Sequence, residues 1–350
     1  MKKRLTALLL AGLMLLMMAA CKKENDAEPA SSQEPVDPNW PVAVGDIRLQ
    51  EKPESVVSLS PALTEIIYEL GGMEQLTGVS DYCDYPDSVR DLAQCGTSQL
   101  PDLDAIEDLE PQVVFSSSPL SQEDTVELQQ MGAEVVVLAH ADSMDSLREL
   151  YVAAGTILGG MIDGERNGEE TFDPLEQNYR ALTAAAQSME SPITGIYLRM
   201  TPLMMATGDT FEGTLLEEIG IKNAAAEFTD WEYPQEKAVD LYPDIIFYDK
   251  TVDAQYLKDA QVYNTTDAVK NERCYEFDAT AFERQSARMF DELETMFREA
   301  YPDVQVDLTD APEPEDAPAE TAESSEQSES AESSSEDEEV LSLDDMTKVN

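Results

Sequence analysis

Histidine, tryptophan and basic residues are scarce in this 350-residue sequence. It contains one His, two Trp, and 22 Lys and Arg against 73 Asp and Glu, which gives a formal net charge of −51. Binding to nucleic acid depends on neutralising phosphates with Lys and Arg, so we expect no nucleic-acid partner. We also find no glycine-rich phosphate loop, no CxxC pair, no recognisable pair of a catalytic nucleophile and its base, and no recognisable set of three metal ligands. The sequence therefore does not predict an enzyme.

Long apolar runs are also rare, and the one at the N-terminus is too short to span a membrane. It covers residues 5–18, follows the basic start Lys2-Lys3-Arg4 and ends at Ala19-Ala20-Cys21. A spanning helix needs about 20 apolar residues, so we predict a signal peptide over residues 1–20. The ending resembles a bacterial lipobox, which implies that Cys21 is lipidated and anchors the protein at the outer face of the cytoplasmic membrane. The alternative is an ordinary secretory signal with a chance cysteine.

Large apolar residues are sparse again near both ends of the remaining chain. Residues 21–42 and 304–350 are rich in Glu, Asp, Ser and Pro. Such segments bury too little surface to offset the entropy of ordering, so we predict a disordered tether and a disordered acidic tail. Cysteine is scarce as well. Apart from Cys21 only Cys83, Cys95 and Cys274 occur, and this odd number argues against a disulfide framework, although a Cys83–Cys95 pair stays open.

A repeated segment organises the body of the chain. Residues 104–115 (DAIEDLEPQVVF) align with residues 236–247 (EKAVDLYPDIIF), 132 positions later. Each begins with an acid and carries Asp-Leu-x-Pro before two β-branched residues and Phe, which predicts a short helix stopped by its proline and then a buried strand. The repeat indicates two lobes of similar design, although this pattern is also common in α/β proteins.

The remaining pattern predicts doubly wound α/β lobes, because short apolar runs alternate with helical spacing. We expect an N-terminal lobe over 43–145 and a C-terminal lobe over 192–303. Residues 146–191 between them show helical spacing only, so we expect a long bridging helix there, with a loop or break at the polar stretch 163–170.

Three segments of the sequence resemble those of a known protein family: residues 56–65 (VVSLSPALTE), 78–86 (GVSDYCDYP) and 100–104 (LPDLD). Together they resemble the helical-backbone solute-binding proteins that deliver cobalamin, siderophore-bound iron or haem to ABC importers. The resemblance covers about residues 46–301. It implies a two-lobed monomer, a small-molecule metal-chelate ligand in the cleft between the lobes, no cofactor of the protein's own and a permease partner.

Within that family the sequence is most similar to the cobalamin-binding branch. Tyr82 matches a cleft tyrosine of that branch, Arg284 in FERQSAR matches an arginine that contacts the corrinoid, and Trp231 with Tyr233 falls where the branch has a cleft tryptophan. We expect Arg284→Ala to weaken binding without lowering the melting temperature. Two positions depart from the branch, because Ser98 replaces an expected tryptophan and Thr280 an expected aspartate. The alternatives are half-buried core for the three aromatic residues and an ordinary surface position for Arg284.

Haem or a ferric siderophore is the rival ligand. The residues able to bind haem iron are Tyr82, His140, Met200, Met204 and Met205. A loop histidine is more often structural or solvated, and methionines at strand ends more often fill a core. A surface sensory or adhesion module and an envelope enzyme are lower-ranked alternatives.

Asp104 and Glu236, the matched acids of the repeat, have counterparts in the family that dock into the two membrane subunits of the permease. We therefore predict that they dock this chain to a permease dimer, one acid per subunit. The alternative is that each acid complements the dipole of its helix.

Overall fold

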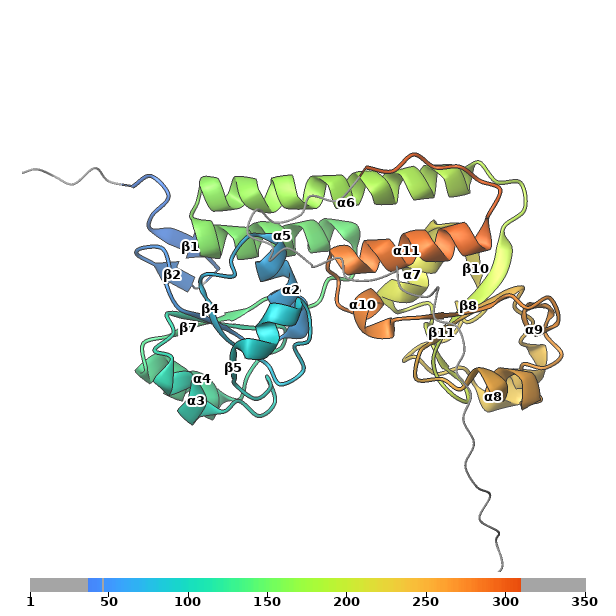
Figure 1. The fold of residues 1–350 in the computed structure, drawn as a ribbon, viewed down its shortest axis with the longest axis horizontal. Coiled ribbons are helices and arrows are strands. Elements are labelled where there is room, and N and C mark those ends of the chain that lie inside the picture. The colour runs from blue at the N-terminus through green and yellow to red at the C-terminus, as the bar shows by residue number, and fades with distance from the viewer. Residues whose placement is uncertain (1–36, 46, 310–350) are drawn as a thin grey trace, which may run out of the picture. The chain divides into compact units, whose positions relative to one another are not determined.

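This computed structural model describes residues 37–45 and 47–309 (Figure 1). The predicted signal peptide, Cys21, most of the predicted tether and nearly all of the predicted tail lie outside these residues. Within the described ranges, no helix is both long and apolar enough to cross a lipid bilayer.

The N-terminal lobe is built on a parallel five-stranded sheet. Its order is β5 (Ala93–Gln94), β4 (Leu76–Val79), β3 (Val56–Ser58), β6 (Val113–Ser116) and β7 (Glu134–Val137). The helices of the lobe are α2 (Pro61–Glu69), the 3-10 helix η1 (Asp87–Asp91), α3 (Leu103–Asp108) and α4 (Gln122–Gln130). A hairpin of β1 (Val42–Val44) and β2 (Ile47–Leu49) precedes them. Ser60 caps α2 by accepting the Leu63 N–H, and Pro61 occupies the first turn, where a missing N–H does no harm.

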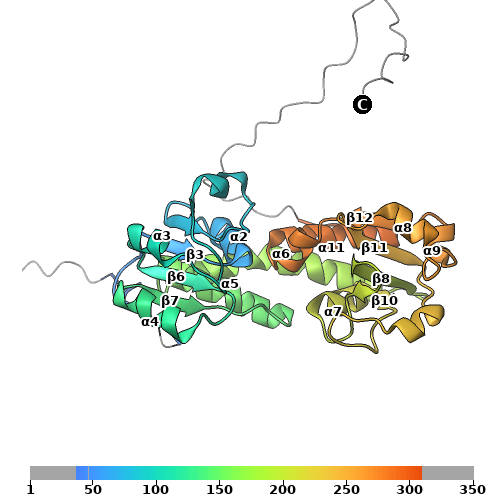
Figure 2. The same cartoon turned by 90° about the horizontal axis from the view of Figure 1, so that it is seen from below.

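The C-terminal lobe has a sheet of the same design. Its parallel strands lie in the order β10 (Ile221–Asn223), β8 (Ile193–Met200), β11 (Ile245–Asp249) and β12 (Cys274–Phe277), and β9 (Met204–Met205) adds antiparallel to β8. The helices are α7 (Phe211–Glu218), the 3-10 helix η2 (Gln235–Asp240), α8 (Ala254–Asp259), α9 (Asp267–Lys270), α10 (Ala279–Glu283) and α11 (Ala287–Ala300). Figure 2 shows β3, β6 and β7 side by side in the N-terminal lobe, and β10, β8, β11 and β12 in the C-terminal lobe.

The repeat corresponds to a duplicated topology. When the two-residue strands β5 and β9 are set aside, the four remaining strands of each lobe have the same order, with the first strand in the chain between the second and the third and with the fourth beside the third: β4-β3-β6-β7 and β10-β8-β11-β12. The two repeated segments form α3 with β6 and η2 with β11, and both strands are buried. The second helical segment is a 3-10 helix rather than an α-helix, and it lacks a side-chain cap such as the one that Asp102 provides for α3.

Side chains on the two faces of each sheet enter different apolar clusters, as expected for doubly wound lobes. In the N-terminal lobe Val57 packs with Ile106 of α3 and Leu128 of α4, whereas Val56 packs with Ile66 of α2. In the C-terminal lobe Ile246 and Tyr248 pack with α8 and α9, whereas Ile245 and Phe247 face α7 and α11. The cluster that contains Val56 and Ile66 of the N-terminal lobe also contains Ile245 and Phe247 of the C-terminal lobe. The two lobes therefore share one apolar core.

The connection between the lobes is the helix pair α5 (Met144–Gly159) and α6 (Asp163–Gln187). Helix α6 contacts both α5 and α11, and Figure 1 shows it running past both sheets. Its 25 residues span about 37 Å at 1.5 Å per residue. The expected bridging helix is present.

The expected break at residues 163–170 is wrong, because α6 begins at Asp163 and continues through Pro174. Asn39 explains the start: its side-chain oxygen accepts the N–H groups of Ile162 (3.1 Å) and Asp163 (2.9 Å). This cap comes from 123 residues earlier in the chain, so local sequence gives no sign of it.

The structured body also extends beyond the expected boundaries at both ends. Trp40 packs against the core and β1 begins at Val42, inside the predicted tether. At the other end Val304–Thr309 lies against α6, where Asn178 exchanges hydrogen bonds of 2.7 and 2.8 Å with the backbone of Thr309. Val306 and Leu308 pack on the core there, so their apolar side chains order a segment that its acidic composition predicts to be disordered.

Candidate functional site

The predicted site residues lie at or beyond the carboxyl ends of the strands. Tyr82 follows β4, Met200 ends β8, Trp231 follows β10 and Arg284 lies beyond β12. In open parallel sheets ligands bind outside this edge, because the loops that leave the strands converge there. The duplicated topology gives the protein two such edges, one in each lobe.

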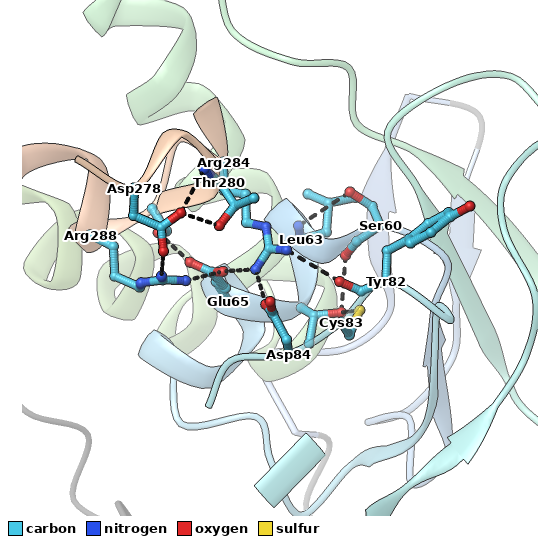
Figure 3. Close-up of polar contacts among 12 residues, drawn as sticks. Ser60, Leu63, Glu65, Tyr82, Cys83, Asp84, Asp278, Thr280, Arg284 and Arg288 are labelled. Atoms are coloured by element: carbon cyan, nitrogen blue, oxygen red, sulfur yellow. Dashed lines mark hydrogen bonds and ion pairs between the residues drawn. The ribbon is translucent and has the colours of Figure 1, made fainter. Parts of the chain in front are cut away.

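Tyr82 and Arg284 come from different lobes and meet in one place. The Arg284 Nη2 atom donates to the backbone carbonyl of Tyr82 over 3.2 Å, and Nη1 forms an ion pair with Asp84. Tyr82 itself is 70% exposed, and Figure 3 shows its ring pointing away from the arginine. The structure therefore brings the two residues together through backbone contact, with the aromatic ring free to meet a ligand.

Arg284 is not the ordinary surface residue of the alternative interpretation. Its side chain is only 12% exposed, and its Nη1 atom also lies 2.8 Å from Oε1 of Glu65, which is fully buried. Arg288 Nη1 donates to the same oxygen over 2.9 Å (Figure 3), and Ser286 Oγ donates to Oε2 over 2.6 Å. Removing one partner of such a buried pair is strongly destabilising, so, in contrast to the prediction from sequence, this geometry leads us to expect that Arg284→Ala lowers the melting temperature. Direct contact between Arg284 and the ligand stays a prediction.

Neighbours of Arg284 make further contacts between the lobes. The side-chain amide of Gln285 accepts the Ala141 N–H over 2.7 Å and donates to the Ala141 carbonyl over 2.8 Å. Gln285 has a φ of +59°, a left-handed conformation that is uncommon for residues other than glycine. The Ala287 N–H donates to Glu69 over 2.9 Å. We call residues 284–288 the inter-lobe turn.

Glu69 adds a perturbed carboxyl group beneath the inter-lobe turn. Burial of the carboxyl group raises its pKa from 4.5 to about 8, and the negative charge of Glu65 adds to this, against hydrogen bonds from Tyr151 and Ala287. The residue as a whole keeps some exposed surface, but its carboxyl end is enclosed by these neighbours.

The predicted aromatic pair of the C-terminal lobe divides into two environments. Trp231 is half-buried, with its ring 5.8 Å from that of Tyr197, and it has a φ of +63°. Tyr233 is buried against Phe228, at 4.7 Å between ring centroids. It also lines a surface hollow of about 780 Å³ together with Met204 and Glu236. Tyr233 therefore belongs mainly to the core, whereas Trp231 borders the carboxyl edge.

A polar cluster lies beneath Trp231. Glu283 accepts a hydrogen bond from the Tyr197 hydroxyl, and Arg199 Nε lies 2.8 Å from Glu283 Oε1. Burial raises the pKa of Glu283, although Tyr197 and Arg199 oppose the shift. The nearby Glu212 has its pKa raised to about 7, again chiefly by burial. Sequence inspection did not single out these residues, because acids are so abundant in the chain.

The methionines and His140 also separate by environment. Met200 is 54% exposed and pairs across β8 and β9 with Met204, which is 39% exposed, whereas Met205 is fully buried. His140 is exposed after β7 and borders a narrow hollow shared with Arg284 and Gln285. That hollow has no room for a small-molecule ligand. A metal site is not evident in the described ranges, where no cluster of three His, Cys, Asp or Glu side chains is arranged to hold an ion.

Asp104 and Glu236 lie at equivalent positions of the two lobes. Asp104 is exposed in the first turn of α3, and Glu236 is exposed in the first turn of η2. The helices α3 and η2 lead into the amino ends of β6 and β11, so their first turns, which carry the two acids, lie toward the carboxyl edge of each sheet. Their role in docking stays a prediction. Cys83, Cys95 and Cys274 are all free thiols, and the first two are buried.

The inter-lobe network is the part of the site that sequence inspection missed. A partial signal existed, since Glu65 lies among apolar residues on the buried face of its helix, where an unpaired charge is costly. Its partner Arg284 is 219 residues away, and no local pattern joins the two.

Comparison with known proteins identifies the family. A family model described as "Periplasmic binding protein" matches residues 56–281. The chain belongs to the periplasmic binding protein family. It is accordingly a solute-binding protein of an ABC transporter, as the resemblance predicted, and not an enzyme. A permease and a small-molecule ligand are the partners that follow from this, and the location is outside the cytoplasm.

Individual relatives agree with this assignment. The ABC transporter substrate-binding lipoprotein YvrC of Bacillus subtilis is 27% identical over 87% of this chain and 99% of its own length. A cobalamin-binding protein of Halobacterium salinarum is 26% identical over 63% of this chain and 62% of that protein. The solved structure of the periplasmic haem-binding protein HutB of Vibrio cholerae is 21% identical, with a TM-score of 0.62 over 71% of this chain and 99% of that chain. The structural similarity establishes the fold.

Proposed function

We propose that the protein is a lipid-anchored solute-binding protein that captures cobalamin or another corrinoid and delivers it to an ABC permease. The observation that carries this proposal is the exposed Tyr82 and Met200 at the carboxyl edges of two duplicated sheets. The name of the Halobacterium salinarum relative supports the ligand class, and the similarity to YvrC supports the lipid anchor at Cys21.

The chemistry of these residues suits a corrinoid, which is a broad and mostly apolar macrocycle edged with amides. Tyr82 and Trp231 offer flat, rigid contact area with a polar group at the rim, and Met200 offers a flexible apolar contact. Tyr233 contributes through its contact with the hollow beside Met204. Arg284 lies beside the same edge, with its guanidinium group held by Glu65 and Asp84.

Haem is the second candidate, because a tyrosine hydroxyl can bind ferric iron and Tyr82 is well exposed. The fold shared with the haem-binding HutB supports this alternative. A ferric siderophore would use the same exposed edge through its organic shell.

Docking to the permease is proposed to use Asp104 and Glu236. The two acids recur in register in the two lobes and are both exposed. They suit a two-fold permease that presents one basic pocket per subunit, and such rim charges steer and orient association more than they add affinity.

The experiment that tests the ligand is calorimetric titration of the mature chain with cyanocobalamin, haemin and a ferric siderophore. We expect saturable binding of one cyanocobalamin per chain and much weaker binding of the other two. Visible spectra recorded alongside would detect iron ligation by haemin. Tight binding of haemin with no binding of cyanocobalamin would reject the corrinoid assignment in favour of haem.

A further inference from the structure

The inter-lobe turn connects Arg284 with one particular segment of the other lobe, the loop Tyr82–Asp84. Arg284 Nη2 donates to the Tyr82 carbonyl over 3.2 Å, and Nη1 binds the Asp84 carboxylate. The guanidinium group therefore holds the loop at both ends (Figure 3). Between these two points the Cys83 N–H donates to the Ser80 carbonyl over 2.9 Å, and the Cys83 thiol lies 3.2 Å from Thr64 Oγ1.

Glu65 fixes the position of Arg284. Its fully buried carboxylate receives Arg284, Arg288 and Ser286, all from the inter-lobe turn. An arginine presents a rigid, planar fork of donors, so two or three acceptors fix both its position and its orientation. Gln285 adds two hydrogen bonds to Ala141 in the same turn. The turn is thus bonded to three segments of the N-terminal lobe, namely α2, the Tyr82–Asp84 loop and Ala141.

This network fixes the relative geometry of the groups that it joins more than it adds stability. A buried ion pair contributes little net stability compared with an apolar contact of equal volume, but it is satisfied in only one geometry. Exposed Tyr82, in contrast, has its ring outside the network. The protein therefore uses residues of the C-terminal lobe to set the backbone from which a ligand-facing ring of the N-terminal lobe projects.

We propose that Arg284 is a positioning residue that holds the Tyr82–Asp84 loop between the lobes and so presents the Tyr82 ring to the ligand. This proposal rests on the proposed function for its effect on affinity, but the position of the loop is measurable without any ligand. It differs from the resemblance-based expectation, in which Arg284 acts by touching the corrinoid.

Cys83 reports the state of the loop directly. It is only 7% exposed, whereas Cys95 is fully buried in the sheet region and reports the integrity of the lobe. We expect Arg284→Ala to increase the alkylation rate of Cys83 by N-ethylmaleimide about tenfold or more, because local opening then costs less. Alkylation of Cys95 is expected to stay unchanged. Mass spectrometry of tryptic peptides assigns the modified thiols, and the full mature chain is used throughout.

Two further variants sharpen the measurement. Arg284→Lys keeps the charge beside Glu65 but cannot hold both ends of the loop, so it should give an intermediate Cys83 rate; it also serves if Arg284→Ala does not fold. Arg148→Ala is the matched control, because Arg148 pairs with Asp173 and Glu176 away from the loop. It should leave Cys83 protected. Unchanged protection of Cys83 in both Arg284 variants would overturn the proposal.

A double-mutant cycle with cyanocobalamin separates positioning from direct contact. We expect Arg284→Ala to weaken binding about tenfold in the wild-type background but by less than about twofold when Tyr82 is already Ala, because coupled residues are not additive. Additive losses would show that Arg284 acts on the ligand independently of Tyr82 and would overturn the proposal. If the wild-type chain does not bind cyanocobalamin, the corrinoid function fails, while the Cys83 rates still decide whether Arg284 holds the loop.

Discussion

At the scale of single residues, Glu65 and Glu69 beneath the inter-lobe turn differ in whether a positive charge balances their carboxyl groups. Glu65 faces two arginines and a serine hydroxyl. Glu69, one helical turn later, receives the Tyr151 hydroxyl and the Ala287 N–H but has no ion pair among the described contacts. Burial without a counter-charge disfavours the ionised form, which explains why the pKa of Glu69 rises to about 8.

The raised pKa of Glu69 predicts a pH-dependent loss of stability. A carboxyl group whose pKa is higher in the folded than in the unfolded state contributes most below pH 4.5, and this contribution is lost as the pH rises toward 8. The loss is on the order of a few kcal/mol. Glu69→Gln removes the titration, so we expect its melting temperature relative to wild type to rise steadily between pH 5 and pH 8.5.

Differential scanning calorimetry across this range checks the prediction. Glu169→Gln is the control, because Glu169 is exposed on α6 and should leave the pH dependence unaltered. A constant difference in melting temperature between Glu69→Gln and wild type at every pH would contradict the assignment.

At the scale of elements, the contact between α5 and α6 depends on glycine. Gly155 and Gly159 of α5 face Gly164 and Gly168 of α6, and the two backbones approach closely. A Cβ atom at Gly168 would lie 2.7 Å from the Tyr151 carbonyl oxygen and 2.7 Å from the Val152 Cα atom. Both neighbours are backbone atoms, so they cannot move aside as a side chain could.

This geometry predicts that Gly168→Ala destabilises the protein. Helix propensity alone would favour alanine by about 1 kcal/mol, whereas overpacking against backbone costs about 1–3 kcal/mol. We expect packing to prevail, with a net loss of up to about 2 kcal/mol in urea unfolding. Glu169→Ala, at the next residue on the exposed side of α6, is the matched control and should change stability little. A stabilised Gly168→Ala variant would mean that the helices are not in this close contact.

Elements were also what the sequence predicted best, and particular cases explain the limits. The strands around Val56, Val113 and Ile245 were correctly located because short apolar runs lie between turn signals. The start of α6 was missed because its cap, Asn39, is remote in sequence. The pairing of Glu65 with Arg284 was missed for the same reason, although Arg284 itself was identified by resemblance. Segment 304–309 was assigned to the tail because composition does not reveal a single docking contact such as Asn178 with Thr309.

At the scale of the whole molecule, the duplicated lobes present Asp104 and Glu236 at equivalent places. We predict that the double variant Asp104→Lys with Glu236→Lys abolishes ligand uptake by cells while the purified protein binds its ligand normally, because reversed charges oppose basic pockets on the permease. Uptake and binding are measured on the same variant.

The control for this charge reversal is Glu165→Lys with Glu169→Lys. Both residues are exposed on α6, away from the carboxyl edges of the sheets, and the change in net charge is identical. This control should retain uptake. Normal uptake by the Asp104 and Glu236 double variant would refute the docking role and leave these acids as partners of their helix dipoles.

The central claim is that one ligand site draws on both lobes, and cyanocobalamin titration of single-lobe variants tests it most directly. Tyr82→Ala alters the N-terminal lobe and Met200→Ala the C-terminal lobe, with Tyr242→Ala and Met161→Ala as equally simple changes at exposed positions away from the carboxyl edges. We predict that each of the first two raises the dissociation constant about three- to tenfold and that the controls do not. An unchanged dissociation constant in either Tyr82→Ala or Met200→Ala would contradict a site shared between the lobes.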